Sequence, residues 1–321
     1  MNYKTIHNTE IKVSSFAMGT GGFGGNIGEE FAGKLFDSYR EKGGNFIDTA
    51  NCYGRWLADG LNNSELTIGR MLKSRGCRKD IVLGTKGAHP RFNTMHIPRM
   101  SKEELATDLE ESLKALQTDY IDIYWLHRDD PSQPVEEIME NLNIHVRAGK
   151  VRAIGCSNWE ANRIKAALEY SKKAGITAFC ADQNHYNLAK VNDEVMAGAF
   201  QTSANDDVIT LYKKSGITAI PYSSQAQGLF SKAMEPDFYQ NPNYEALRKL
   251  YLNPTTERHI KAVKNITQQT DFEPTQIALA YLINQPFDVV PIISTSSIER
   301  LNDIFDATKI KLTKEQMESL I

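Results

Sequence analysis

Residues 121–158 read IDIYWLHRDDPSQPVEEIMENLNIHVRAGKVRAIGCSN and contain one complete strand–helix–strand unit. The runs that start at Ile121 and Val151 are short and nearly continuously apolar, which is typical of parallel strands covered on both faces. Between them, Glu136 to Val146 shows helical periodicity, and Gly149 follows near its end, where a left-handed C-cap residue is common. This segment therefore predicts a parallel sheet with a crossover helix.

The same alternation recurs along the rest of the chain. Further helical patterns cover Arg163 to Lys173 and Val208 to Lys214, and Ser101 with Glu104 forms a capping box before another. With the two strands above, the remaining β-rich runs make eight candidate strands: VSSFAMG from Val13, NFIDTA from Asn45, IVLGTK from Ile81, AFCADQ from Ala178, ITAIPYS from Ile217 and VVPIIS from Val289. Eight strands that alternate with helices predict a (β/α)₈ TIM barrel.

Three segments lie outside this repeat. YKTIHNTEIK, residues 3–12, has the pattern of a short hairpin turning at His7 and Asn8, which we expect at the bottom of the barrel. Gly87 to Met100 after strand three and Gly228 to Thr256 after strand seven are longer than ordinary barrel loops. Loops of that length usually form lids or binding walls.

The composition indicates an ordinary globular protein whose 321 residues, 1–321, can form a single barrel domain. With 37 basic and 40 acidic residues the net charge is −3, which gives no basic field for nucleic acid, so a small molecule is the expected partner. No apolar run approaches the roughly 20 residues of a membrane span, and the first residues lack the apolar core of a signal peptide. We therefore expect a cytoplasmic protein without a membrane contact.

The cysteines and histidines do not predict a metal site. Cys52, Cys77, Cys156 and Cys180 lie far apart and form no CxxC pair, so we expect reduced thiols that pack in the core. The histidines likewise show no paired metal-ligand spacing.

Polar side chains follow the predicted strands where each strand ends. In an α/β barrel the active site lies at the carboxyl ends of the strands, so these groups converge on one mouth. In chain order they are Asp48 with Tyr53, Lys86, His127, Ser157 with Asn158, Gln183, and Tyr222.

Four of these groups suit proton transfer at a carbonyl or hydroxyl oxygen. A tyrosine has an ordinary pKa of roughly 10, so Tyr53 needs a cation near its oxygen to act near neutrality. Lys86 supplies that charge, Asp48 is its counter-ion, and His127 can orient a substrate oxygen.

No side chain can donate a hydride, so carbonyl reduction requires a nicotinamide cofactor. Ser157, Asn158 and Gln183 offer amide and hydroxyl partners for a carboxamide, and Tyr222 offers a flat face for the ring.

The motifs around these positions resemble those of the aldo-keto reductase superfamily from the first hairpin to the last helix. They are FIDTANCYG, GTK, YIDIYWLHRDDP, GKVRAIGCSNW, DQNHYN, PYSSQAQGLF and PIISTSSIERL. The resemblance implies reduction of aldehydes, ketones or sugars, with Tyr53 as general acid and base, its pKa lowered by Lys86 and Asp48, and the carbonyl oriented by His127. It also places Ser157, Asn158 and Gln183 on the carboxamide, Tyr222 under the ring, and Ser223, Gln225, Gly228 and Leu229 along the pyrophosphate.

The C-terminal segment bears on the choice between NADP and NAD. Arg300 matches the arginine that meets the 2′-phosphate in relatives, and Asp303 remains as a partner on the adenine side, whereas Ser294 stands where many relatives carry a lysine and Ile304 replaces an amide. A phosphate would keep one guanidinium and the hydroxyls of Ser294, Thr295 and Ser297, so NADP is favoured and NAD stays open.

The substrate walls are less well defined by the sequence. The first loop, GTGGFGG from Gly19, lacks the tryptophan that many relatives carry there. Our candidates for the walls are Phe23, Trp56, His89 and Phe92.

Several other interpretations were weighed. Gly19, Gly21 and Gly24 spell GxGxxG, but the helix expected within a dinucleotide fingerprint begins only near Glu29. His127 to Asp129 reads HRD, but Pro134 stands where a kinase needs asparagine.

Two other function classes compete with the oxidoreductase: a cofactor-binding regulatory subunit, as in relatives that partner channels, and a metal-dependent barrel hydrolase. The substrate, the direction of the reaction and the oligomeric state are not predicted.

Overall fold

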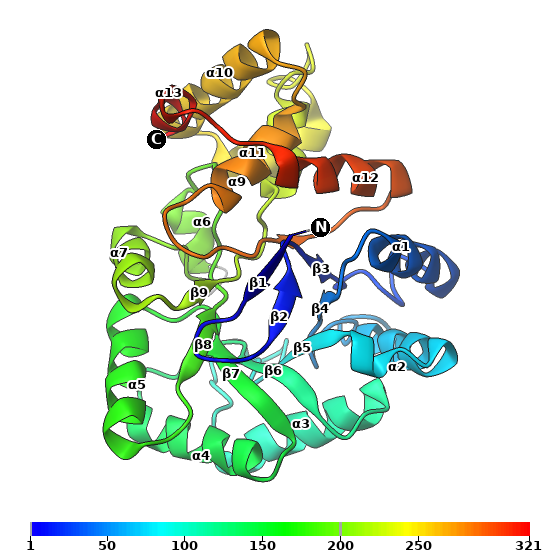
Figure 1. The fold of residues 1–321 in the computed structure, drawn as a ribbon, viewed down its shortest axis with the longest axis vertical. Helices are drawn as coiled ribbons and strands as arrows, with labels where there is room; N and C mark the ends of the chain where they lie inside the picture. The colour runs from blue at the N-terminus through cyan, green and yellow to red at the C-terminus, as the bar shows by residue number, and fades with distance from the viewer. Residues whose placement is uncertain (1, 199–200) are drawn as a thin grey trace.

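A computed structural model describes residues 2–198 and 201–321 (Figure 1). Its main sheet has eight parallel strands in the order β10-β3-β4-β5-β6-β7-β8-β9. The Ala219 N–H donates to the Asp288 carbonyl at 2.9 Å, and the Val290 N–H donates to the Ala219 carbonyl at 2.8 Å, which closes the ring between β9 and β10. The predicted (β/α)₈ barrel is confirmed. The strands are β3 (Ala17–Gly19), β4 (Phe46–Asp48), β5 (Val82–Gly87), β6 (Ile121–Leu126), β7 (Val151–Cys156), β8 (Phe179–Asp182), β9 (Thr218–Ala219) and β10 (Ile292–Ile293).

Helices surround the strands. The layer around the barrel contains α1 (Glu29–Glu41), α2 (Asn63–Arg75), α3 (Lys102–Leu116), α4 (Val135–Arg147), α5 (Ala161–Ala174), α7 (Asp206–Ser215), α11 (Pro274–Ile283) and α12 (Ile298–Asp306). The other helices are α6 (Asp193–Gly198), α8 (Leu229–Lys232), α9 (Glu245–Tyr251), α10 (Pro254–Gln269) and α13 (Lys314–Ser319), with short 3₁₀ turns at Arg78–Asp80, Ala226–Gly228, Pro242–Tyr244 and Ala307–Lys309. None of the described helices is both long and apolar enough to cross a membrane.

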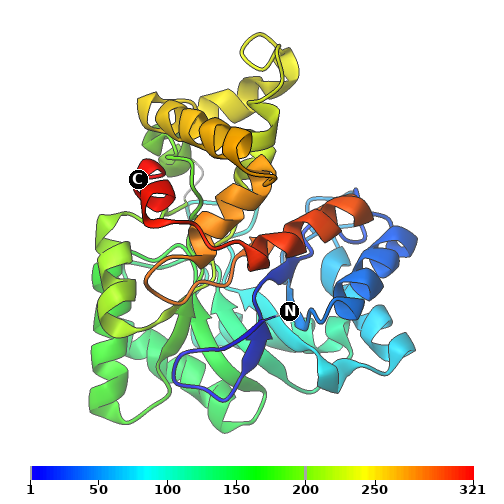
Figure 2. The same cartoon turned by 45° about the horizontal axis from the view of Figure 1, so that its top comes forward.

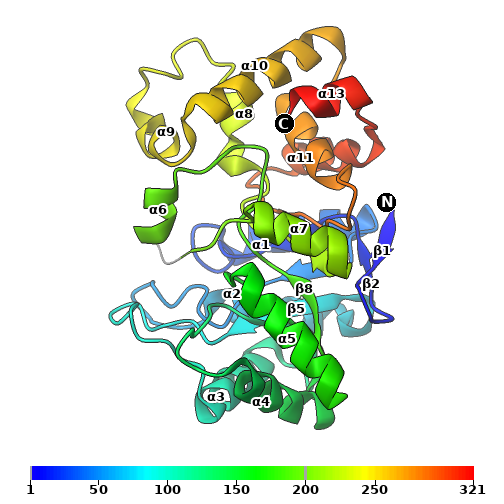
Figure 3. The same ribbon diagram turned by 90° about the vertical axis from the view of Figure 1, so that its left-hand side faces the viewer.

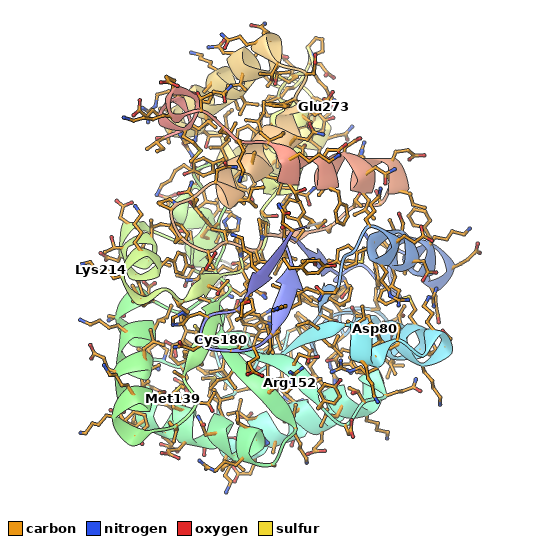
Figure 4. The ribbon with its side chains drawn as sticks, viewed as in Figure 1. Asp80, Met139, Arg152, Cys180, Lys214 and Glu273 are labelled. Atoms are coloured by element: carbon orange, nitrogen blue, oxygen red, sulfur yellow. The ribbon has the colours of Figure 1, made fainter. Side chains whose placement is uncertain are left out.

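The barrel strands are apolar on both sides because they separate two cores. On β6, Tyr124 and Leu126 pack against the outer helices, whereas Ile123 and Trp125 face the barrel interior. Figure 4 labels Met139, a buried residue of α4, and Cys180, a buried residue of β8 within the inner cluster. The continuous apolar runs of the sequence therefore have a direct structural cause.

The N-terminal hairpin covers one end of the barrel, as predicted. It pairs β1 (Tyr3–Thr5) with β2 (Lys12–Ser14). The His7 N–H donates to Thr218 Oγ1 at 3.0 Å, and the Ser14 N–H donates to Asn45 Oδ1 at 2.7 Å. In Figure 1 the dark-blue hairpin lies in front of the strands, and in Figure 3 it lies on the opposite side of the sheet from α6.

The start of the first barrel strand needs a correction. We expected it to run from Val13, but Val13 belongs to β2 of the hairpin and β3 begins only at Ala17. The segment resembles a single strand because the chain passes from the hairpin into the barrel without an exposed loop, and Ser14 and Ser15 between them are both buried.

One of the two expected long loops is present. Residues 88–101 after β5 contain no helix or strand. The expectation of a loop from Gly228 to Thr256 is wrong, because α8, α9 and the start of α10 lie within it. These helices pack into a separate apolar cluster through Phe230, Leu247 and Tyr251, together with Ile277 of α11. Figure 2 shows the yellow and orange helices grouped at one side of the barrel.

A buried carboxyl between α2 and β5 predicts a pH-dependent stability. Burial raises the pKa of Glu65 from its ordinary value of 4.5 to about 7, although Thr85 Oγ1 and Asn62 Nδ2 each donate to it at 2.6 Å. Since the folded-state pKa of Glu65 lies above the unfolded value, protonation of this carboxyl favours the folded state. Its contribution to the free energy of unfolding is complete below about pH 4.5 and is lost as the pH rises through about 7.

We expect the free energy of unfolding of the wild type to fall by about 2–3 kcal/mol relative to that of Glu65→Gln between about pH 5 and pH 8. Urea unfolding followed by circular dichroism measures this difference. Glu137→Gln, on the exposed face of α4, is the matched control and should track the wild type. Parallel curves for wild type and Glu65→Gln would contradict the prediction.

Candidate active site

A buried ion pair on two neighbouring strands lies at the centre of the open end of the barrel. Lys86 Nζ is 2.6 Å from Asp48 Oδ2 and 3.2 Å from the Tyr53 hydroxyl, and it donates to the Thr49 carbonyl at 2.8 Å. Asp48 pairs in register with Gly84, so Lys86 lies just beyond it on the adjacent strand. The structure thus brings together three of the residues that the sequence placed at strand ends.

The charges of this group are set by burial and by each other. Burial opposes the charge of Lys86, but Asp48 and Tyr53 together raise the pKa of its ammonium group. Burial raises the pKa of Tyr53, and the Lys86 charge opposes this rise. Asp48 also raises the Tyr53 pKa, so the expectation that Asp48 lowers it needs correction: its favourable role is to hold Lys86 in place.

His127 completes the predicted group of four. Its ring centroid lies 5.9 Å from that of Tyr53 and 4.7 Å from that of His89. Burial lowers the pKa of His127, with further contributions from His89, Arg128 and Lys86, so the imidazole is neutral at pH 7. A neutral imidazole keeps one N–H to donate to a substrate oxygen.

The residues expected to meet a carboxamide form a hydrogen-bonded chain beside this group. Gln183 Nε2 donates to Asp48 Oδ1 at 2.9 Å, and Ser157 Oγ donates to the Gln183 carbonyl at 2.6 Å. Asn158 Nδ2 donates to Ser157 Oγ at 3.0 Å, and the Tyr222 hydroxyl donates to Asn158 Oδ1 at 2.8 Å. The chain connects the ion pair on β4 and β5 with Tyr222, which follows β9.

A cavity of about 860 Å³ extends from this group to helix α12. At its inner end it is bordered by Asp48, Tyr53 and the glycine-rich segment after β3, and α12 borders its outer end. The predicted cofactor residues that line it are Tyr222, Ser223, Gln225, Gly228, Ser294, Thr295, Arg300 and Asp303. An extended cavity with an aromatic ring near one end and a guanidinium near the other fits a nicotinamide dinucleotide.

Five predicted cofactor residues do not line this cavity: Ser157, Asn158 and Gln183, which are buried in the hydrogen-bonded chain beside it, and also Leu229 and Ser297. Leu229 is fully buried and packs with Phe230 in the cluster around α8. Ser297 Oγ caps α12 by accepting from the Arg300 N–H at 3.3 Å, and it donates to Glu299 Oε2 at 2.7 Å. The Ser297 hydroxyl is therefore already used within the helix.

Three of the four candidate substrate residues form one aromatic wall beside Tyr53. Trp56 and Phe92 have ring centroids 5.9 Å apart, and those of His89 and Phe92 are 5.3 Å apart. Trp56 and Phe92 are 54% and 47% exposed, so they present a large apolar surface to solvent. Phe23 is only 3% exposed and packs in the core, because the short bridge between Phe23 and Ile27 turns its ring inward.

Two residues of the mouth were not among the predicted site residues. Cys52 Sγ is 3.5 Å from His127 Nδ1, and it forms with His89 and His127 a group whose possible ligand atoms all lie within 4.8 Å of one another. Arg128 follows His127 directly, and its Nε is buried. Both lie within motifs that the sequence shows, NCYG and HRDD, but the spacing of the cysteines predicts only core packing for Cys52, and the HRD pattern by itself points to a kinase.

Comparison with known proteins identifies the class: the chain belongs to the aldo/keto reductase family, whose model matches residues 15–320. A relative in Saccharomyces cerevisiae named "Putative aryl-alcohol dehydrogenase AAD14" is 33% identical over 313 residues, covering 93% of this chain and 78% of the relative. Norsolorinic acid reductase stcV of Emericella nidulans is 30% identical over 323 residues, covering 96% and 77%. The structure of the thermostable aldo-keto reductase Tm1743 with the inhibitor epalrestat matches with a TM-score of 0.76 and 26% identity, covering 100% and 98% of the two chains.

The buried ion pair predicts a large and non-additive effect on stability. Asp48→Asn leaves the Lys86 ammonium buried without its counter-ion, so we expect the free energy of unfolding to fall by about 3–5 kcal/mol. Asp48→Asn combined with Lys86→Met should be clearly more stable than Asp48→Asn alone. Urea denaturation of the two single variants and the double variant measures the coupling. Additive losses would show that the pair does not act as a unit.

Proposed function

We propose that this chain is an NAD(P)-dependent oxidoreductase that transfers a hydride between a nicotinamide cofactor and an aldehyde, ketone or sugar, with Tyr53 as general acid and base. Family membership and relatives named as dehydrogenases and reductases support the reaction class. The observation that carries the assignment is the position of Lys86 Nζ, 3.2 Å from the Tyr53 hydroxyl beside a cavity of cofactor size.

The mechanism follows from the charges around Tyr53. A nicotinamide cofactor, when bound, would supply the hydride for the carbonyl carbon. The Tyr53 hydroxyl donates its proton to the carbonyl oxygen, and Lys86 stabilises the phenolate left behind. Neutral His127 donates a hydrogen bond to the same oxygen and holds it in line with Tyr53. In alcohol oxidation the same groups act in reverse, and Tyr53 accepts the proton.

The cofactor would lie in the cavity between β9 and α12. Tyr222 would stack against the nicotinamide ring, while Ser157, Asn158 and Gln183 would bind its carboxamide. Ser223, Gln225 and Gly228 would follow the pyrophosphate. Arg300 on the first turn of α12, with Ser294 and Thr295 nearby, offers a guanidinium and two hydroxyls to a 2′-phosphate, so NADP is favoured over NAD.

Removal of the Tyr53 hydroxyl tests the mechanism. We expect Tyr53→Phe to lower kcat/KM for aldehyde reduction by about 100-fold or more, since positioned acid–base groups contribute about that much. NADPH affinity, measured by fluorescence quenching, should change little. Tyr170→Phe, whose hydroxyl bonds Glu140 on the outer surface, is the matched control.

Undiminished NADPH oxidation by Tyr53→Phe would exclude this role for Tyr53. A wild-type chain that binds NADPH but oxidises none with a panel of aldehydes, ketones and sugars would instead favour the regulatory-subunit hypothesis.

The phosphate assignment is tested at Arg300. Because a charge-assisted hydrogen bond is worth about 1.5–3 kcal/mol, Arg300→Gln should weaken NADPH binding by about tenfold or more and leave NADH binding nearly unchanged. Parallel titrations with both cofactors measure the ratio. Arg258→Gln, on the exposed face of α10, is the control. Equal losses for NADPH and NADH would place the 2′-phosphate elsewhere.

A further inference from the structure

Arg128 is a cation in the mouth of the barrel without an ionic partner among the described residues. Its Nη1 donates to the His127 carbonyl at 3.1 Å, whereas its buried Nε has no hydrogen-bond partner. Arg163, close by, makes two bonds of 2.8 Å to Asp129. A half-buried guanidinium that lacks a carboxylate and has one donor fully shielded from water is costly to the folded chain, and such a cost persists most readily where a ligand supplies the missing anion.

The charge of Arg128 acts on the groups of the active site. Burial is the main reason why the pKa values of His127 and His89 are lowered, and the Arg128 charge lowers them further; burial raises the pKa of Cys52, and Arg128 opposes that rise. Tyr222 and Tyr53 act on Arg128 in turn, after the larger effect of burial. The guanidinium therefore lies among the same side chains that surround the proposed position of the reacting carbonyl.

These charges decide between a metal ion and an anion as the occupant. The Cys52, His89 and His127 group has donor atoms of the kind that bind zinc. However, Lys86 and Arg128 both exert their positive charge on Cys52 and on His127. A divalent cation would be repelled by both, whereas an anion would be attracted by both and would also find neutral imidazoles near it.

The aromatic wall indicates what carries the anion. Trp56 and Phe92 are half-exposed and stand edge to face beside Tyr53, with ring-centroid distances of 6.2 Å from Tyr53 to Trp56 and 5.9 Å from Trp56 to Phe92. Flat apolar surfaces of this kind favour an aromatic ring. A small molecule with an anionic group for Arg128 and an aromatic ring for this wall would be an aryl carboxylate.

We propose that Arg128 is a specificity-determining residue that pairs with the carboxylate of an aromatic aldehyde or ketone whose carbonyl oxygen lies at Tyr53. The planar guanidinium can bind a carboxylate through two parallel hydrogen bonds, and no carboxylate of the described residues is paired with it. This inference rests on the proposed function, because it names the substrate class of the same site.

The test compares 3-formylbenzoate with its methyl ester, which share the ring and the aldehyde and differ in charge. For the wild type we expect kcat/KM with NADPH to be at least about tenfold higher for the acid. Arg128→Gln should lower the acid-to-ester ratio of kcat/KM by about tenfold or more. Arg128→Lys should retain part of this ratio, because lysine keeps the positive charge but lacks the planar guanidinium that can donate two parallel hydrogen bonds. Arg55→Gln is the matched control at the same rim, since Arg55 is already paired with Glu111 at 2.5 Å.

Calorimetric titration of both compounds into the protein, with and without NADP⁺, gives a second measurement that does not need turnover. Tighter binding of the acid that is lost in Arg128→Gln supports the inference even if the variant's activity is low. Equal binding of acid and ester, or a ratio that Arg128→Gln and Arg128→Lys leave unchanged, overturns it.

The outcomes separate this inference from the proposed function. If the wild type reduces acid and ester equally well, the oxidoreductase assignment stands and the role of Arg128 fails. If it reduces neither of them nor any member of the panel of aldehydes, ketones and sugars, but binds the acid through Arg128, the assignment fails and the anion site stands. A preference for glyceraldehyde 3-phosphate over 3-formylbenzoate that depends on Arg128 overturns the assignment of an aryl carboxylate as the substrate. Micromolar Zn²⁺ binding that is lost in Cys52→Ser overturns the conclusion that the site excludes a metal ion.

Discussion

The ion pair between Lys86 and Asp48 is the constraint on which the open end of the barrel depends. An ammonium group that is 1% exposed is tolerated only if oxygen atoms replace its lost water. Asp48, the Thr49 carbonyl and the Tyr53 hydroxyl provide that replacement. The same contacts that make the buried charge acceptable bring it to the Tyr53 oxygen, whose proton we propose is transferred, so one set of hydrogen bonds would serve both stability and the proposed chemistry.

Much of the fold and of the catalytic group could be predicted from the sequence, and for one reason. Residues at the ends of parallel strands have their positions set by the sheet, so Asp48, Lys86 and His127 could be placed together without a structure. Burial of both strand faces likewise leaves a continuous apolar signal, as on β6. Features that depend on the regular barrel were therefore visible in the sequence.

What could not be predicted depends on packing outside the strands. The helices between Gly228 and Thr256 are stabilised by a separate apolar cluster, and the Asn and Pro residues that suggested a loop include the cap of α10 at Asn253 and Pro254. Phe23 was assigned to a substrate wall, but a local bridge turns it into the core. Arg128 was set aside with its motif, because the lack of an ionic partner becomes visible only in three dimensions.

The N-terminal hairpin has a consequence for the order in which the chain can fold. His7 is bonded to Thr218, which lies 211 positions later in the chain, and Lys4 is 3.5 Å from Asp288. The hairpin therefore cannot reach these contacts until the chain has been synthesised as far as Asp288. Contacts of such long sequence separation slow folding, because much chain entropy is lost before they form. Once docked, the hairpin closes the inner core through Ile6, Ile11 and Val13, at the end opposite to the candidate active site.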